Sequence, residues 1–188
     1  GASLDKALSK GFAYSDCWVD DARLVVCNAM AAAANGADIR TRTELVKARR
    51  SDGLWRAWFH DHTNNAEFTV RARALVNAAG PWVESLLHGP LALRDTEGVR
   101  LVKGSHIVVP RIYVGRHAYI LQHTDRRVVF VMPFEGDFSL IGTTDVVLSG
   151  TPEDAAVEAE EIAYLCQVVS SYFKTPIRPY DVVWSYTG

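Results

Sequence analysis

The feature that most restricts the fold is a series of short strand-like runs, arranged in two blocks with a helical pattern in each. The first block holds three such runs, near residues 39–50, 54–59 and 68–72. The second block holds five, at residues 100–110, 119–122, 128–133, 138–142 and 182–186. Short turns rich in Gly, Asn and Asp join most neighbouring runs, and strands joined in this way pair antiparallel. The pattern therefore predicts an α+β protein with a β-meander followed by a mostly antiparallel sheet.

Two longer segments have helical patterns. The first opens at Asp20 or Asp21, either of which can cap a helix, and stops at Asn35-Gly36. It is apolar almost all round, which is typical of a helix packed between other elements. The second opens at Thr151-Pro152 and runs to residue 173. Its apolar residues recur at helical spacing and predict one face that lies on the second sheet: Ile162, Leu165, Cys166, Val169 and Phe173.

A continuous apolar run at residues 74–79 is typical of a strand buried on both faces. Gly80-Pro81 ends it, and a short helix is expected from Trp82 to Leu87. A strand, a tight glycine turn and a helix start together allow backbone N–H groups to face a phosphate or the polar edge of a ring.

One strand-like run is interrupted by polar residues. Between apolar neighbours lie Lys103, Gly104, Ser105 and His106. An imidazole titrates near neutral pH and can accept a proton from an alcohol, so His106 is the best candidate for catalysis. The alternative is a buried core histidine bonded to a carbonyl. Lys103 could bind an anion or extend its ammonium to solvent.

Thr143 and Thr144 follow a buried strand together with Asp145. At that position they could present two hydroxyls and an acid to a ligand, or they could form an ordinary strand-end turn.

Composition and motifs exclude several classes of function. The net charge is -2, and no basic patch has interleaved aromatics, so no nucleic-acid partner is expected. His60-Asp61-His62 lacks a third ligand, so no metal site is expected. Three widely spaced cysteines fit a reducing compartment, and no run is long and apolar enough to span a membrane. The G-x-G-x-x-G, P-loop and G-x-S-x-G patterns are absent.

Four segments together resemble one family, the FAD-dependent glycerol-3-phosphate dehydrogenases of the bacterial aerobic type. They are residues 14–24, 77–82, 103–106 and 141–145. The resemblance implies oxidation of sn-glycerol 3-phosphate to dihydroxyacetone phosphate, with hydride transfer to FAD and electrons passing to quinone. It also implies that residues 11–98 form part of a glutathione-reductase-type FAD domain and that residues 99–188 form most of a substrate-binding domain.

The resemblance also implies roles for individual residues. Leu45 matches a backbone contact to adenine, and the cofactor would also contact Ala78, Ala79, Gly80 and Gly104. His106 matches a histidine over the flavin that accepts the proton of the C2 hydroxyl. The substrate contacts implied on the same wall are Lys103, Ser105, Thr143 and Thr144.

The chain departs from the family pattern in two places. The Gly-rich loop is missing together with the early segment that supplies cations for the substrate phosphate, and an arginine that faces the substrate is expected only after Gly188. We therefore expect a central fragment that binds no FAD tightly and does not turn over, with His106 accessible to solvent. The parent is expected to be cytoplasmic and peripherally associated with the inner membrane.

Two alternatives remain open from the sequence. The chain could come from another FAD-dependent amine or hydroxy-acid oxidoreductase, or it could be a non-catalytic β-rich interaction domain.

Overall fold

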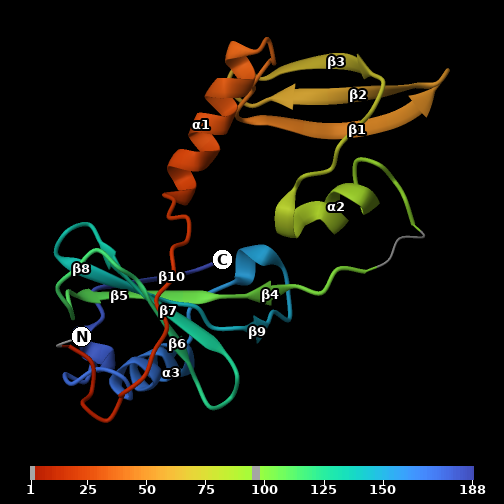
Figure 1. The fold of residues 1–188 in the computed structure, drawn as a ribbon. Helices are drawn as coiled ribbons and strands as arrows, with labels where there is room; N and C mark the ends of the chain where they lie inside the picture. Colours follow the sequence, from red (N-terminus) through yellow and green to blue (C-terminus); the bar gives the residue numbers. More distant parts are fainter. Residues whose placement is uncertain (1–2, 95–97) are drawn as a thin grey trace. The chain divides into compact units, whose positions relative to one another are not determined.

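A computed structural model of the chain describes residues 3–94 and 98–188. It divides into two compact units, one formed by Gly1–Phe12 with Val99–Gly188 and the other by Ala13–Gly98. The ribbon in Figure 1 shows the elements of each unit. The boundary expected between residues 98 and 99 directly follows a segment of the chain in which residues 95–97 lie outside the described residues.

A five-stranded antiparallel sheet forms the larger unit, as the strand pattern predicted. Its strands in spatial order are β10 (Trp184–Thr187), β5 (Ser105–Pro110), β8 (Phe138–Gly142), β7 (Val128–Phe134) and β6 (Tyr119–Gln122). Strands β4 (Val102–Lys103) and β9 (Val146–Val147) form a separate two-stranded sheet. In sequence, β4 directly precedes β5 and β9 follows β8. Within this sheet, β6 and β8 each pair with their sequence neighbour β7, whereas β5 pairs with β8 and β10, which are distant from it in sequence.

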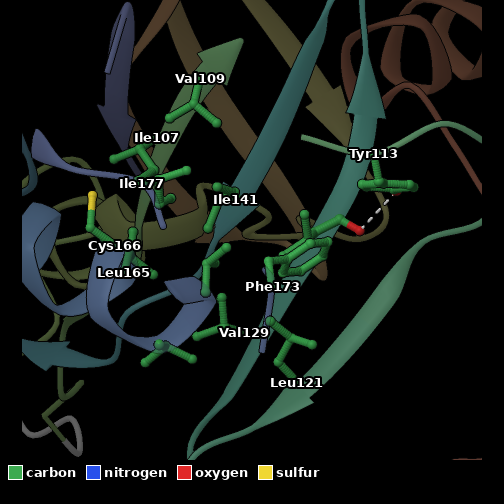
Figure 2. Close-up of a cluster of buried hydrophobic side chains, with 13 residues drawn as sticks. Ile107, Val109, Tyr113, Leu121, Val129, Ile141, Leu165, Cys166, Phe173 and Ile177 are labelled. Carbon is green, nitrogen blue, oxygen red and sulfur yellow. Dashed lines mark hydrogen bonds between the residues drawn. The ribbon is translucent and has the colours of Figure 1, made fainter. Parts of the chain in front are cut away.

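Helix α3 (Ala159–Ser170) covers one face of this sheet (Figure 1). Figure 2 shows the core between them, where side chains of α3 meet inward-facing side chains of the strands. Leu165, Val168 and Val169 from the helix are completely buried, as are Ile107 and Ile141 from the sheet. The predicted apolar face is therefore confirmed, and Val168 joins it.

The start of this helix differs from the prediction. Residues Pro152–Asp154 form a separate 3₁₀ turn, η2, closed by a reciprocal cap between Thr151 and Asp154. The chain is then extended at Ala155. Helix α3 begins at Ala159 after Glu158, whose backbone N–H donates to Glu161 Oε2 at 3.0 Å. The Thr-Pro-acid signal thus marks a real helical turn, but the turn ends after three residues. A further 3₁₀ turn, η3 (Pro179–Asp181), precedes β10.

The smaller unit contains the predicted meander. Strands β1 (Thr43–Ser51), β2 (Leu54–Asp61) and β3 (Ala66–Ala72) pair in order and antiparallel (Figure 1). A bulge interrupts the register between Leu45 and Lys47. Helix α1 (Asp21–Ala34) begins after the capping residue Asp20 and ends just before its C-terminal cap Asn35, as predicted.

Two predictions for this unit are wrong in the structure. No residue of α1 is buried, so the helix is not packed on all sides; Val25 is 68% exposed. Residues 74–79 are irregular rather than a buried strand, and Val76 is 83% exposed. A strand needs a neighbouring strand to complete its hydrogen bonds, and the described residues place none beside this run. Its end is as expected, with a 3₁₀ turn η1 (Gly80–Trp82) followed by α2 (Val83–His88).

Candidate active site

Strand β5 presents opposite chemistry to the two faces of the large sheet. Successive side chains of a strand point to opposite faces. Ser105, Ile107 and Val109 point towards α3 and have no exposed surface. His106 lies between them in sequence and therefore points to the other face, where its side chain is half-buried. It is thus neither a core histidine nor a freely exposed one.

The imidazole of His106 is held by residues on both neighbouring strands. On β10, Tyr186 is directly opposite His106, and the two rings stack with centroids 4.8 Å apart and planes 5° apart. On β8, the residue opposite is Gly142. A Cβ at Gly142 would lie 2.0 Å from Cδ2 and 2.5 Å from Nε2 of His106. The ring therefore occupies space that only a glycine leaves open.

Large apolar side chains surround this histidine on the face of the sheet that α3 does not cover, called the uncovered face below. Phe130, in β7, pairs directly with Gly142, and Trp184 contacts Tyr186 with ring centroids 5.1 Å apart. Phe130 is 39% exposed and Trp184 is 56% exposed. The result is an apolar, aromatic surface around the His106 imidazole. Such a surface suits a reaction in which an alcohol loses a proton close to a flat, apolar partner.

The opposite face of β5 rests on a buried polar cluster, defined as Lys103, Ser105, Thr144 and Glu161. Glu161 is 5% exposed and sits in the first turn of α3. Its Oε1 accepts hydrogen bonds from Ser105 Oγ at 2.8 Å and Thr144 Oγ1 at 2.6 Å. Its Oε2 accepts from Lys103 Nζ at 2.8 Å and from the Glu158 backbone N–H at 3.0 Å.

This cluster keeps both charged groups ionised. Burial raises the pKa of the Glu161 carboxyl, but the hydrogen bonds from Lys103, Thr144, the Glu158 backbone and Ser105 outweigh burial and lower the pKa to about 2. The hydrogen bond to Glu161, followed by the one to Glu158, raises the pKa of Lys103 above its ordinary value. A paired and fully hydrogen-bonded carboxylate is the form in which a buried charge is tolerated.

The geometry argues against direct substrate contacts by three residues that the resemblance placed on the wall. Lys103 is 4% exposed, and its ammonium also donates to Ala156 O at 2.7 Å and Glu158 Oε1 at 2.9 Å. Ser105 and Thr144 point to the α3 side and are buried. The ammonium of Lys103 therefore lies on the α3 side of the sheet, paired with Glu161 and Glu158.

Gly104 and Thr143 are packed closely together. A Cβ at Gly104 would lie 2.3 Å from Thr143 Oγ1, and that hydroxyl donates to Thr144 O at 3.0 Å. Gly104 also exchanges two backbone hydrogen bonds with Gly188. Thr143 is half-buried, so of the two threonines it is the one that retains exposed surface.

The cofactor residues expected in the smaller unit form two local features. Leu45 is half-buried opposite Phe59 at the edge of the β1 bulge, which frees backbone groups of the strand from regular pairing. Ala78, Ala79 and Gly80 form a turn in which Asn77 Oδ1 accepts from Ala79 N at 3.2 Å. Gly80 has φ +55°, and nothing lies within 4 Å of where its Cβ would be.

These features fit part of an FAD site. The open Gly80 turn allows a flat ligand to approach the backbone closely, which a side chain there would prevent. A complete dinucleotide site also needs a Gly-rich phosphate loop, and the sequence contains none. His106 belongs to the larger unit.

The sequence prediction missed Glu161, Tyr186 and Gly142. Glu161 precedes Leu165 by four residues and Val168 by seven, so it lies in the apolar stripe of α3. A charged residue inside such a stripe was the available signal. Tyr186 and Gly142 become neighbours of His106 only through strand register, which no local motif specifies.

Within residues 3–94 and 98–188, no three His, Cys, Asp or Glu side chains are grouped so that they could hold a metal ion. His62 Nε2 instead pairs with Glu44 Oε2 at 2.9 Å. No helix of this described part is both long and apolar enough to cross a membrane.

The chain matches a family model described as FAD dependent oxidoreductase over residues 2–188. D-erythritol 1-phosphate dehydrogenase of Brucella abortus is 50% identical over 100% of this chain and 38% of its own length. Glycerol-3-phosphate dehydrogenase of Pseudomonas aeruginosa is 49% identical over 100% of the chain and 37% of its own length. Aerobic glycerol-3-phosphate dehydrogenase of Escherichia coli is 46% identical over 98% of this chain and 37% of its own length. The chain thus spans well under half the length of these relatives.

Solved structures are similar as well. The glycerol-3-phosphate dehydrogenase of Bacillus halodurans complexed with FAD has a TM-score of 0.76 and 28% identity, covering 90% of this chain and 34% of that one. The L-alpha-glycerophosphate oxidase of Mycoplasma pneumoniae with FAD bound has a TM-score of 0.63 at 19% identity and shares the fold. The family resemblance inferred from the four sequence segments is confirmed by these findings.

Proposed function

The chain belongs to the FAD-dependent oxidoreductase family, and from that premise we propose that the whole protein oxidises sn-glycerol 3-phosphate to dihydroxyacetone phosphate. The observation that carries the proposal is the imidazole of His106, fixed between Tyr186 and the bare backbone of Gly142 on an apolar sheet face. Relatives 49% and 46% identical are named glycerol-3-phosphate dehydrogenases.

The chemistry divides between the cofactor and the chain. FAD, when bound, supplies the acceptor for the hydride that leaves C2 of the substrate. His106 accepts the proton of the C2 hydroxyl, so that one hydride and one proton leave and a ketone forms. Stacking on Tyr186 fixes the plane of the imidazole.

A second substrate has direct support. The Brucella abortus relative at 50% identity is named D-erythritol 1-phosphate dehydrogenase. D-erythritol 1-phosphate and glycerol 3-phosphate share a phosphate ester beside a secondary alcohol and differ in chain length. The two identities, 50% and 49%, do not separate these substrates. We therefore propose glycerol 3-phosphate first and D-erythritol 1-phosphate as the alternative within the same reaction class.

The experiment follows the flavin colour of the whole protein. Under anaerobic conditions, glycerol 3-phosphate is expected to bleach the visible flavin absorbance, and D-erythritol 1-phosphate and sarcosine serve as comparisons. Faster bleaching by the erythritol ester would reassign the substrate. Bleaching by sarcosine alone would replace the alcohol reaction with oxidation of an amine, and bleaching by none of the three would contradict the proposed reaction class.

The electron acceptor and location are further parts of this proposal. We propose that the electrons pass to quinone and that the protein acts on the cytoplasmic side of the inner membrane as a peripheral protein. Both follow from the resemblance to the aerobic bacterial family. Reduction of a soluble quinone analogue with glycerol 3-phosphate, and sedimentation of the protein with lipid vesicles, test the two statements separately.

A further inference from the structure

The carboxylate of Glu161 has four donors, and they come from three separate parts of the larger unit. Lys103 and Ser105 flank the junction of β4 and β5, Thr144 follows β8, and the Glu158 backbone caps α3. A carboxylate offers about four lone-pair sites, so this one is fully satisfied. The side chain is almost completely buried, and it ties the helix to both chain segments beside His106.

Thr144 links the Glu161 carboxylate to the backbone of β5, the strand that contains His106. Its Oγ1 donates to Glu161 and accepts from the backbone N–H of Ser105 at 2.8 Å. His106, the next residue, pairs with Gly142, where the ladder between β5 and β8 begins. Just before this ladder begins, the Thr144 hydroxyl therefore accepts the Ser105 N–H in place of a backbone carbonyl of a regular strand.

The direction of each hydrogen bond depends on the negative charge of Glu161. Because the carboxylate only accepts, the Thr144 hydroxyl must point its hydrogen at Glu161 and turn a lone pair towards Ser105 N–H. The Ser105 hydroxyl donates to the same oxygen. An amide at position 161 could accept with only one of its two polar atoms, so it could not receive all four donors.

We propose that Glu161 is a positioning residue for the reaction: from the covered face of the sheet, its carboxylate holds Thr144 and the start of β5, and so places His106 over Gly142 on the uncovered face. This inference rests on the proposed role of His106 as proton acceptor. Glu161 does not reach the uncovered face and touches no reacting atom.

The test compares Glu161→Gln with Glu160→Gln in the whole flavoprotein. Glu160 is the adjacent, exposed glutamate of the same helical turn, so it receives the same chemical change outside the cluster. In Glu161→Gln, kcat for glycerol 3-phosphate is expected to fall roughly tenfold to a hundredfold, because small displacements of a reacting group have effects of this size. KM and FAD content should change little, and Glu160→Gln should match the parent.

A second pair of variants separates positioning from folding. Thr144→Val keeps the Glu161–Lys103 pair but removes the acceptor for Ser105 N–H, and Thr144→Ser keeps the hydroxyl. The kcat should fall in the first variant and recover in the second. Amide hydrogen exchange gives a readout that does not need activity. Exchange at Ser105 should accelerate more in Glu161→Gln and Thr144→Val than exchange at Val129, in β7, which reports the global stability of the fold.

Each outcome has a defined meaning. Unchanged kcat in both Glu161→Gln and Thr144→Val would overturn the positioning role, and so would unchanged exchange at Ser105. Equal acceleration of exchange at Ser105 and Val129 would also overturn it, because Glu161 would then support the whole fold. If the parent oxidises no polyol phosphate but Ser105 exchange responds as expected, the proposed function fails while the local coupling stands.

Discussion

The replacement of Gly142 by alanine gives the sharpest prediction for the site. In the structure, the added Cβ would lie 2.0 Å from Cδ2 of the His106 ring, whereas ordinary contact begins at 3.4 Å. The ring must therefore withdraw by about 1.4 Å or the two strands must separate. Because Tyr186 stacks on the same ring from the neighbouring strand, the imidazole cannot move without breaking that stack.

Both consequences can be measured on the whole flavoprotein. A displacement of more than 1 Å at a reacting group predicts a fall in kcat of roughly a hundredfold. Overpacking of this kind costs about 1–3 kcal/mol of stability, which a urea unfolding curve detects. Gly11→Ala is the matched control, because nothing lies within 4 Å of its added Cβ and its φ is not positive. A Gly142→Ala protein that retains kcat within about threefold of the parent would refute the placement of His106 over Gly142.

Three further predictions concern the buried residues of the larger unit. Lys103→Met removes the cation that faces buried Glu161 and should destabilise the protein by about 3–5 kcal/mol, whereas the double variant Lys103→Met with Glu161→Leu should recover most of that loss. Thermal unfolding of both variants measures these differences, and equal stability of Lys103→Met and the parent would contradict the prediction. Because folding lowers the pKa of Glu161 from 4.5 to about 2, its stabilising effect is complete above pH 4.5 and is lost as the pH falls towards 2. In Glu161→Gln, the free energy of unfolding should therefore depend less on pH across that window. If the free energy of unfolding changes with pH equally in the variant and the parent, the Glu161 carboxylate does not stabilise the fold through its lowered pKa. Leu165→Ala leaves a cavity at a fully buried site and should lower the free energy of unfolding in urea by about 2–5 kcal/mol. The exposed control Glu160→Ala should stay within about 0.5 kcal/mol of the parent. A loss of stability in Leu165→Ala no larger than that of the control would show that the core packs differently.

The sequence predicted the elements whose signals are local. The meander and the antiparallel sheet followed from alternation and turn residues, as in β2 and β3 around Asn64-Asn65. The caps of α1 followed from Asp20 and Asn35-Gly36. His106 stood out because it interrupts an apolar strand. In each case, a few consecutive residues contain the physical cause.

Other features depend on contacts that no single segment specifies. The apolar run at residues 74–79 is irregular because a strand exists only beside another strand. The helix expected from Pro152 begins at Ala159, since the capping box of Thr151 and Asp154 closes a single turn. The roles of Lys103, Ser105 and Thr144 depend on Glu161, which is distant in sequence and reaches them only after α3 packs on the sheet.

The measurement that tests the central claim most directly is anaerobic flavin reduction by glycerol 3-phosphate in the whole protein, comparing the parent with His106→Asn. The imidazole is proposed as the acceptor of the hydroxyl proton, so its removal should slow reduction by at least about a hundredfold while FAD content and thermal stability stay unchanged. Reduction of the flavin at the parental rate in His106→Asn would contradict the assignment of His106 as the proton acceptor.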